Sequence, residues 1–182
     1  MSNKSVIAIS GKSGCGNTTV SSLVARELGF AMINYTFRSL AEDLGITFAE
    51  LRRRAEEDDS YDRMLDTKQV ALAREEDCVL GSRLAIWLLE EADLKVYLYA
   101  SPEIRARRIM AREGRTLEET LQETMERDRM DSERYRRIYG IDNRDYQFAD
   151  LIIDTDTCDQ YTCARMIIEA FKAKTGRVDD NQ

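Results

Sequence analysis

A glycine-rich segment near the N-terminus constrains this sequence more than any other feature. The apolar run Ser5-Val-Ile-Ala-Ile-Ser10 is typical of a buried parallel strand. A loop follows, and then a helix that we expect from about Asn17 to Gly29. Backbone N–H groups in such a strand–loop–helix turn, together with the helix N-terminus, can bind phosphate oxygens. The sequence therefore predicts a phosphate-binding glycine-rich loop that consists of Gly11, Lys12, Ser13, Gly14, Cys15, Gly16, Asn17, Thr18 and Thr19.

The glycine-rich loop departs from the pattern G-x-x-x-x-G-K-[ST] at one position. Asn17 stands where this pattern has the lysine that reaches the β- and γ-phosphates. Loss of such a cation can remove about 3 kcal/mol of transition-state stabilisation, which is the scale of one oxyanion-hole donor. Lys12 could supply part of this charge, and Thr18 is placed to hold Mg²⁺ through its hydroxyl. A glycine-rich turn that binds no ligand is the alternative interpretation of these residues.

Strand-like and helix-like segments alternate along the whole chain. We expect strands at 5–10, 31–34, 78–80, 94–99 and 151–154, and helices between most of them. This alternation predicts a three-layer α/β fold, in which helices cover both faces of a mostly parallel central sheet. Residues 1–182 contain no linker, repeat or low-complexity tract, so we expect a single domain. The residues that we expect as helix N-caps are Thr47, Ser60, Ser101 and Thr116.

Composition excludes several classes of protein. The net charge of −7 argues against a protein that wraps a nucleic acid backbone. The longest apolar run, 84–89, is far shorter than a membrane span, and the N-terminus has no signal-peptide pattern. Four cysteines without a C-x-x-C spacing are typical of a reducing compartment. We therefore expect a cytoplasmic protein that binds neither membrane nor nucleic acid.

The absence of histidine limits the chemistry available to this chain. Catalytic triads that use histidine and metal sites that contain it are excluded. The remaining option is chemistry that works by positioning and charge, and phosphoryl transfer is the main reaction class of this kind. Arginine, which suits bidentate phosphate recognition, outnumbers lysine 21 to 6. A compositional bias on solvated helix faces would give the same excess.

Arginines recur at helical spacing in two segments. Arg105, Arg108 and Arg112 fall on one face of the helix expected after Ser101, where they could close over phosphate groups. A solvated face with Arg–Glu pairs is the alternative. In the next helix Arg127, Asp131 and Arg134 share a face, and an aspartate between two arginines can orient both while leaving donors for a ligand. Two further candidates, Arg38 and Arg83, follow short elements near the expected carboxyl edge of the sheet.

The sequence resembles the cytidylate kinases, within the P-loop nucleoside monophosphate kinases, and in particular their short form found chiefly in archaea. Each matching fragment is weak, but their order and spacing along almost the whole chain are specific. The fragments are the glycine-rich loop, Phe37-Arg38-x-Leu-Ala41, Asp62-x-x-x-Asp66-x-x-Gln69, Gly81-Ser-Arg83-Leu-Ala85-x-Trp87, Arg105-x-x-Arg108, Arg127-Asp-x-x-Asp131-x-x-Arg134-Tyr135, Tyr139-Gly-Ile-Asp142 and Asp150-Leu-Ile-Ile-Asp154.

The resemblance implies a monomeric enzyme that transfers the γ-phosphoryl group of ATP, as its Mg²⁺ complex, to CMP or dCMP. It implies that the glycine-rich loop binds the donor phosphates, with Thr18 as the metal ligand. Residues 34–75 would be a helical acceptor-binding region, and 101–118 would be an arginine-rich lid. No general base is needed because the acceptor phosphate is already an anion. The implied acceptor-binding residues are Thr36, Arg38, Arg83, Asp131 and Arg134, and the implied catalytic residues are Arg105, Arg108 and Arg127.

Two alternatives remain open at this level. Another P-loop small-molecule kinase would act on a different monophosphate or on a hydroxyl group. A regulatory module that binds nucleotides without catalysis would explain the missing lysine directly. The chain near Thr36 is also shorter than is usual before the Phe-Arg pair of the family, so the hydroxyl contact to the acceptor phosphate is assigned to Thr36 only as a candidate.

Overall fold

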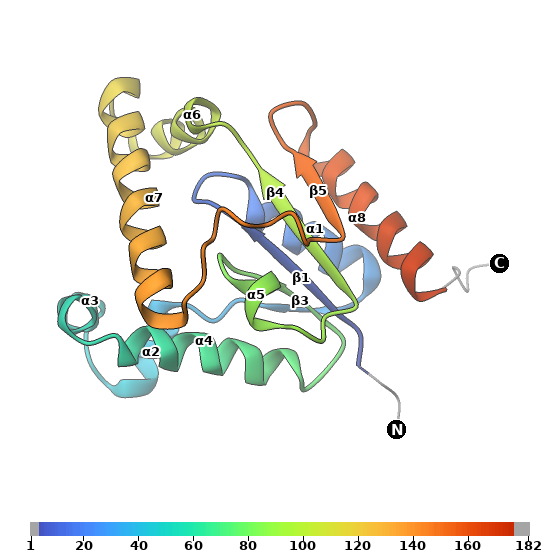
Figure 1. The fold of residues 1–182 in the computed structure, drawn as a ribbon, viewed down its shortest axis with the longest axis horizontal. Coiled ribbons are helices and arrows are strands. Elements are labelled where there is room, and N and C mark those ends of the chain that lie inside the picture. The colour runs from blue at the N-terminus through green and yellow to red at the C-terminus, as the bar shows by residue number, and fades with distance from the viewer. Residues whose placement is uncertain (1–3, 177–182) are drawn as a thin grey trace.

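A five-stranded parallel sheet forms the centre of the computed structural model, which describes residues 4–176 (Figure 1). The spatial order is β2-β3-β1-β4-β5, and every neighbouring pair is parallel. All five carboxyl ends therefore lie at one edge, where ligands bind in open α/β sheets. This result confirms the expected mostly parallel sheet. The strands are β1 (Val6–Gly11), β2 (Ala31–Ile33), β3 (Cys78–Gly81), β4 (Leu94–Tyr99) and β5 (Leu151–Asp154).

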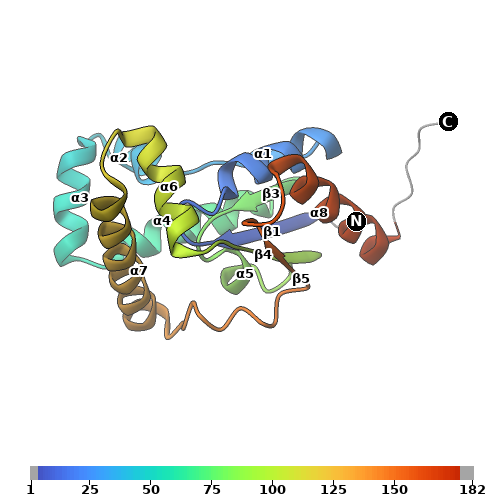
Figure 2. The same cartoon turned by 90° about the horizontal axis from the view of Figure 1, so that it is seen from above.

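Helices cover both faces of the sheet, as the alternating sequence predicts (Figure 2). Alternate residues of β1 point to opposite faces, because side chains alternate along a strand. Ile7 and Ile9 pack in the apolar cluster beneath α1 (Asn17–Leu28) and α8 (Gln160–Thr175). Val6 and Ala8 pack on the other face with α4 (Ser60–Ala73) and α5 (Ala85–Leu88). The expected three-layer architecture is therefore confirmed.

Three helices between β2 and β3 have a small apolar cluster of their own. α2 (Phe37–Leu44) and α3 (Phe48–Glu57) join α4 around Leu51, which is fully buried. Thr36 caps α2 through Ser39, and Thr47 caps α3 by accepting a hydrogen bond from the Glu50 N–H. These helices lie within the segment 34–75.

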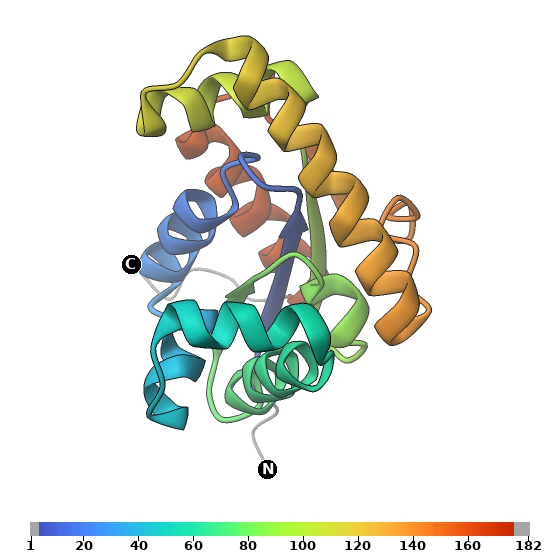
Figure 3. The ribbon, with the colours of Figure 1, turned by 90° about the vertical axis from the view of Figure 1, so that its left-hand side faces the viewer.

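A pair of helices lies beyond the carboxyl edge of the sheet (Figure 3). α6 (Pro102–Glu113) packs against the long helix α7 (Leu117–Tyr139). The end of α7 reaches α4, where Arg137 pairs with Asp59 at 2.7 Å. Ser101 and Thr116 cap α6 and α7, as the sequence predicts. The pair therefore connects the glycine-rich loop region with the α2–α4 group.

The structure corrects two local expectations. Ser60 is not the N-cap of α4 but its first residue, because the Asp58 carboxylate accepts the Ser60 N–H at 2.8 Å and Asp59 takes the cap position. α5 was not predicted from the sequence, because it is too short to show helical periodicity. Within residues 4–176, no helix is both long and apolar enough to cross a membrane.

Candidate nucleotide-binding site

The glycine-rich loop follows β1 directly and opens α1. Gly14 and Gly16 have φ of 82° and 92°, a left-handed region that side chains disfavour. A Cβ at Gly11 would lie 2.5 Å from the Cys15 Sγ and 2.6 Å from the Leu98 carbonyl oxygen. The positions of the three glycines are therefore set by backbone geometry and close packing. The Cys15 thiol points inward, where burial raises its pKa, so this residue faces a ligand with its backbone alone.

The loop borders a cavity of about 760 Å³. This volume lies within the usual range for small-molecule and cofactor sites. All nine residues predicted for phosphate binding line it, which brings Gly11 and Thr19 to one site. The other lining residues come from the carboxyl ends of β3 and β5 and from α1, α6 and α8: Val20, Gly81, Ser82, Arg83, Arg108, Thr155, Cys158, Asp159, Gln160, Tyr161 and Cys163.

The Asn17 side chain makes its hydrogen bonds within the protein. Its Nδ2 donates to the Ile9 carbonyl oxygen at 3.0 Å and to the Ser82 carbonyl oxygen at 3.4 Å. Its Oδ1 accepts a hydrogen bond from the Ser21 hydroxyl at 2.8 Å. The amide therefore ties the ends of β1 and β3 to α1. Asn17 therefore stabilises the loop at the position where the pattern has a lysine.

Thr18 presents an exposed side chain on the first turn of α1. Its carbonyl oxygen accepts from the Ser22 hydroxyl, and the residue lines the cavity. Among residues 4–176 no group of three or more carboxylate or thiol ligands could hold a metal ion. A site with one hydroxyl ligand fits Mg²⁺ that arrives with a nucleotide, because Mg²⁺ retains several waters and binds phosphate oxygens.

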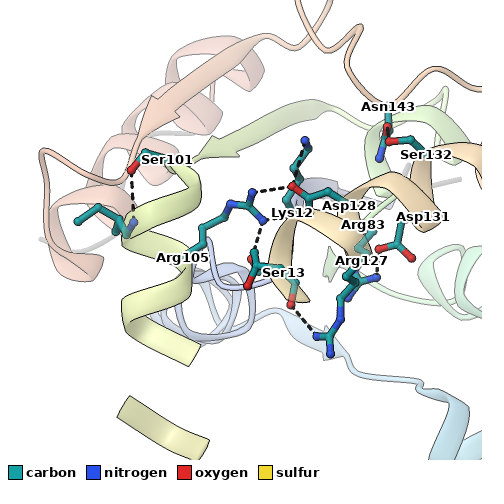
Figure 4. A network of polar contacts seen from close by, with 12 residues as sticks. Lys12, Ser13, Arg83, Ser101, Arg105, Arg127, Asp128, Asp131, Ser132 and Asn143 are labelled. Carbon is teal, nitrogen blue, oxygen red and sulfur yellow. Dashed lines mark hydrogen bonds and ion pairs between the residues drawn. The ribbon is translucent and has the colours of Figure 1, made fainter. Parts of the chain in front are cut away.

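Arg105 lies beneath the loop and is 1% exposed. Its guanidinium donates two hydrogen bonds to the Asp128 carboxylate, at 3.0 and 2.6 Å, and a third to the Ser13 carbonyl oxygen at 3.2 Å (Figure 4). Lys12 Nζ contacts the same carboxylate at 3.3 Å. Asp128 thus joins α7 to both α6 and the loop. No local pattern predicts a role for Asp128, because its partners lie far away in the chain.

Arg108 holds the other side of the loop. It donates to the Gly14 carbonyl oxygen at 3.3 Å and to the Thr155 hydroxyl and carbonyl oxygens at 3.0 and 2.7 Å. The Thr155 hydroxyl donates in turn to the Cys15 carbonyl oxygen at 3.2 Å. Thr155 was missed, although its place directly after the last strand is a signal for the ligand edge of the sheet. The alternative of a solvated face is therefore wrong for Arg105 and Arg108, and the side chain of Arg112 lies outside the described residues.

Arg127 approaches the loop from α7. Its Nη1 donates to the Ser13 hydroxyl at 3.3 Å, and the rest of its side chain is exposed. Its guanidinium therefore has donors that remain available at the loop entrance.

Arg83, Asp131 and Arg134 form a chain of charges beside the loop. Arg83 pairs with the Asp131 carboxylate, which also accepts from Arg134 at 2.8 Å. Arg134 Nε lies 3.5 Å from Asp62 Oδ1, and burial raises the pKa of Asp62. A second cavity, of only about 10 Å³, borders Asp131 and shares Gly11, Lys12 and Arg83 with the large one. The structure therefore brings the predicted Arg83–Asp131–Arg134 group together.

Thr36 and Arg38 are not brought to the loop. The Thr36 side chain caps α2, and Arg38 is exposed with its guanidinium 4.8 Å from the centre of the Phe48 ring. Neither residue is among those that line the two cavities. Their predicted contacts with the acceptor phosphate therefore stay predictions.

Comparison with known proteins decides the family. The sequence model of the Cytidylate kinase-like family matches residues 6–157. The chain belongs to this family. Cytidylate kinase 2 of Borreliella afzelii is 49% identical over 152 residues, which are 81% of this chain and 85% of that protein. The cytidylate kinase of Archaeoglobus fulgidus is 39% identical over 176 residues, which are 95% of this chain and 98% of that protein. The expected likeness to archaeal family members is confirmed.

Solved structures of other kinases share the fold of this cytidylate kinase-like chain. Shikimate kinase from Bacteroides thetaiotaomicron has a TM-score of 0.61 at 16% identity, with 95% of this chain and 99% of that chain covered. Deoxyadenosine kinase from M. mycoides, with bound dATP, has a TM-score of 0.52 at 20% identity, with 90% and 97% covered. These likenesses confirm the P-loop kinase fold.

Proposed function

We propose that this chain is a nucleoside monophosphate kinase that transfers the γ-phosphoryl group of ATP to CMP or dCMP. One observation carries the proposal. The complete glycine-rich loop of a cytidylate kinase-like chain lines a cavity of about 760 Å³, beside a cluster of arginines. Phosphoryl transfer depends mainly on the positioning of phosphates and on charge, and this arrangement supplies both.

Each part of the site has a role in this reaction. The loop N–H groups and the N-terminus of α1 bind the donor phosphates. Arg83 and Arg134, oriented by Asp131, bind the acceptor nucleotide, while Arg38 and the Thr36 hydroxyl bind its phosphate. Thr18 would hold Mg²⁺, which neutralises phosphate charge when it is bound. Arg105 and Arg108 fix the loop through carbonyl oxygens, and Arg127 contributes charge at its entrance. We further propose a cytoplasmic monomer.

A coupled ADP-release assay tests the proposal. Wild-type protein receives MgATP with CMP, dCMP, UMP or AMP, and we expect turnover that prefers CMP or dCMP. Arg83→Ala should lower kcat/KM by roughly 10²- to 10³-fold, the loss typical of one transition-state donor. The variant should fold, because Arg134 still pairs with Asp131. Arg74→Ala, which breaks only the exposed pair with Glu91, is the matched control and should leave turnover unchanged.

Other outcomes would favour the alternatives. A preference for AMP or for a hydroxyl acceptor would identify another P-loop small-molecule kinase. Thermal stabilisation by ATP or CMP without release of ADP would identify a nucleotide-binding module without catalysis.

A further inference from the structure

The site lacks a lysine at position 17, and the structure shows that the Asn17 side chain does not take its place. The Asn17 amide bonds Ile9 and Ser82 carbonyl oxygens and the Ser21 hydroxyl. Its polar atoms are thus already satisfied inside the protein, and the amide carries no charge. A donor-phosphate site still requires a cation to balance charge on the transferred group. That cation must come from another position.

Most cations around the loop already have structural partners. Arg105 is buried and donates to Asp128 and to the Ser13 carbonyl oxygen. Arg108 donates to the Gly14 carbonyl oxygen and to both oxygens of Thr155. Each of these guanidiniums therefore acts on the protein side of the loop. They shape the loop through its carbonyl oxygens. Among the described residues, the other cations beside it are Arg83, which pairs with Asp131, Arg127, which donates to the Ser13 hydroxyl from α7, and Lys12.

Lys12 is a cation within the loop itself. Its side chain is 33% exposed and borders both the large cavity beside the loop and the small cavity beside Asp131, as Arg83 also does. Lys12 therefore lies between the large cavity and the Arg83–Asp131 pair. An ammonium group has three N–H donors, and the structure gives it one contact, with Asp128.

Asp128 holds this ammonium without cancelling its charge. Both carboxylate oxygens already accept hydrogen bonds from Arg105, at 3.0 and 2.6 Å, whereas Lys12 lies at 3.3 Å. Two cations share one carboxylate, so the group has a net charge of +1 beside the loop. The Lys12 ammonium is the more exposed of these two cations and can meet a ligand.

We propose that Lys12 binds the β- and γ-phosphates of the donor nucleotide and takes the place of the lysine that the loop lacks at Asn17. The inference rests on the proposed function, and it assigns a specific residue to the charge that phosphoryl transfer requires. The proposal predicts that Lys12 affects the binding of nucleotides that carry a β-phosphate, such as ATP and ADP, and does not affect the binding of AMP or CMP.

The test combines turnover with calorimetry on Lys12→Ala. We expect kcat with CMP to fall roughly 100-fold, the effect typical of one transition-state donor. Binding of MgATP and ADP should weaken about tenfold, whereas binding of AMP and CMP should stay within twofold of wild type. Lys174→Ala is the matched control, because it also removes a lysine from a Lys–Asp pair, at 2.7 Å from Asp150 and away from both cavities. It should leave every value unchanged.

The outcomes separate this inference from the proposed function. Turnover of Lys12→Ala within threefold of wild type would overturn the role of Lys12 and leave the kinase assignment intact. An equal loss of ATP, AMP and CMP affinity, with a lower melting temperature, would show that Lys12 is purely structural. If wild-type protein binds ADP but does not phosphorylate CMP, the proposed function fails, and the ADP-to-AMP comparison still decides the inference. No binding of ADP by wild type would contradict both.

Discussion

Asp66 is a half-buried carboxyl group whose protonation should influence stability. It accepts a hydrogen bond from the Tyr139 hydroxyl at 2.5 Å, and burial raises its pKa to about 6. The pKa in the unfolded chain is near 3.9. Because the folded form binds the proton more tightly, the stabilisation is complete below about pH 4 and is lost as the pH rises through 6.

Asp66→Asn removes this titration while keeping an oxygen that can accept from Tyr139. We expect the variant to be more stable than wild type by about 2 kcal/mol at pH 7.5, from a shift of about two pKa units at 1.4 kcal/mol each, reduced for partial exposure. Near pH 4 the two proteins should have equal free energies of unfolding. Urea titrations at both pH values measure this difference, and a constant difference across pH would contradict the assignment to Asp66.

Single residues also show what sequence can and cannot predict about this site. The glycines of the loop were predictable because only glycine suits the left-handed backbone at Gly14 and Gly16. The role of Asn17 was not, because one of its two acceptors, the Ser82 carbonyl oxygen, is 65 residues away. The partners of Asp128 are likewise distant in sequence, as Arg105 is 23 residues away. A motif gives backbone requirements, whereas side-chain partners depend on the fold.

At the scale of elements, Arg105 connects α6, α7 and the glycine-rich loop. Arg105→Ala leaves the Asp128 carboxylate with Lys12 alone and removes the bond to the Ser13 carbonyl oxygen. Breaking a buried ion pair by removal of one partner typically costs about 3–5 kcal/mol. We therefore expect a loss of about 3 kcal/mol in the free energy of unfolding, measured by urea titration.

Arg115→Ala is the control for this change. Arg115 pairs with Glu123 where both side chains are about half exposed, so its removal should cost less than about 1 kcal/mol. If Arg105→Ala were no more destabilising than Arg115→Ala, Arg105 would not hold these elements together, and its predicted role would have to be sought at the ligand instead.

The ends of the helices and strands were largely predictable from the sequence, whereas the contacts made by each helix face were not. Local signals such as Ser101 before Pro102 and Gly114 after Glu113 locate the ends of α6 correctly. The arginine spacing on this helix correctly placed Arg105 and Arg108 on one side. It could not show that this side faces the loop carbonyl oxygens, because Ser13 and Gly14 are more than 90 residues away.

At the scale of the whole molecule, the alternation of strands and helices was sufficient to predict a parallel sheet with helices on both faces. What it could not predict is how the α2–α4 group is attached to the rest. Three contacts join α4 and its N-cap to α7: Asp59 with Arg137, Asp62 with Arg134, and Asp66 with Tyr139. Each pairs residues that are more than 70 positions apart, so these contacts follow from the fold and not from local pattern.

Because the α2–α4 group is separate from the glycine-rich loop, we expect ADP and CMP to protect different regions from hydrogen–deuterium exchange. A ligand that binds only the folded form stabilises it by about 2.7 kcal/mol at a hundredfold excess over its Kd, and its effect on local opening is largest where it binds. ADP should therefore slow hydrogen–deuterium exchange in 11–19 and 155–163, which border the large cavity. CMP should instead slow exchange in 34–75, where the α2–α4 group has its own small apolar cluster.

Mass spectrometry of peptides from the two complexes measures this pattern. Arg83→Ala should weaken the CMP effect more than the ADP effect, because Arg83 lines the large cavity but pairs with Asp131, which approaches α4 through Arg134 and Asp62. Protection by CMP that is confined to the glycine-rich loop would contradict the acceptor role of 34–75. In that case both nucleotides would compete for the large cavity beside the loop, and the division of the molecule into donor and acceptor regions would be wrong.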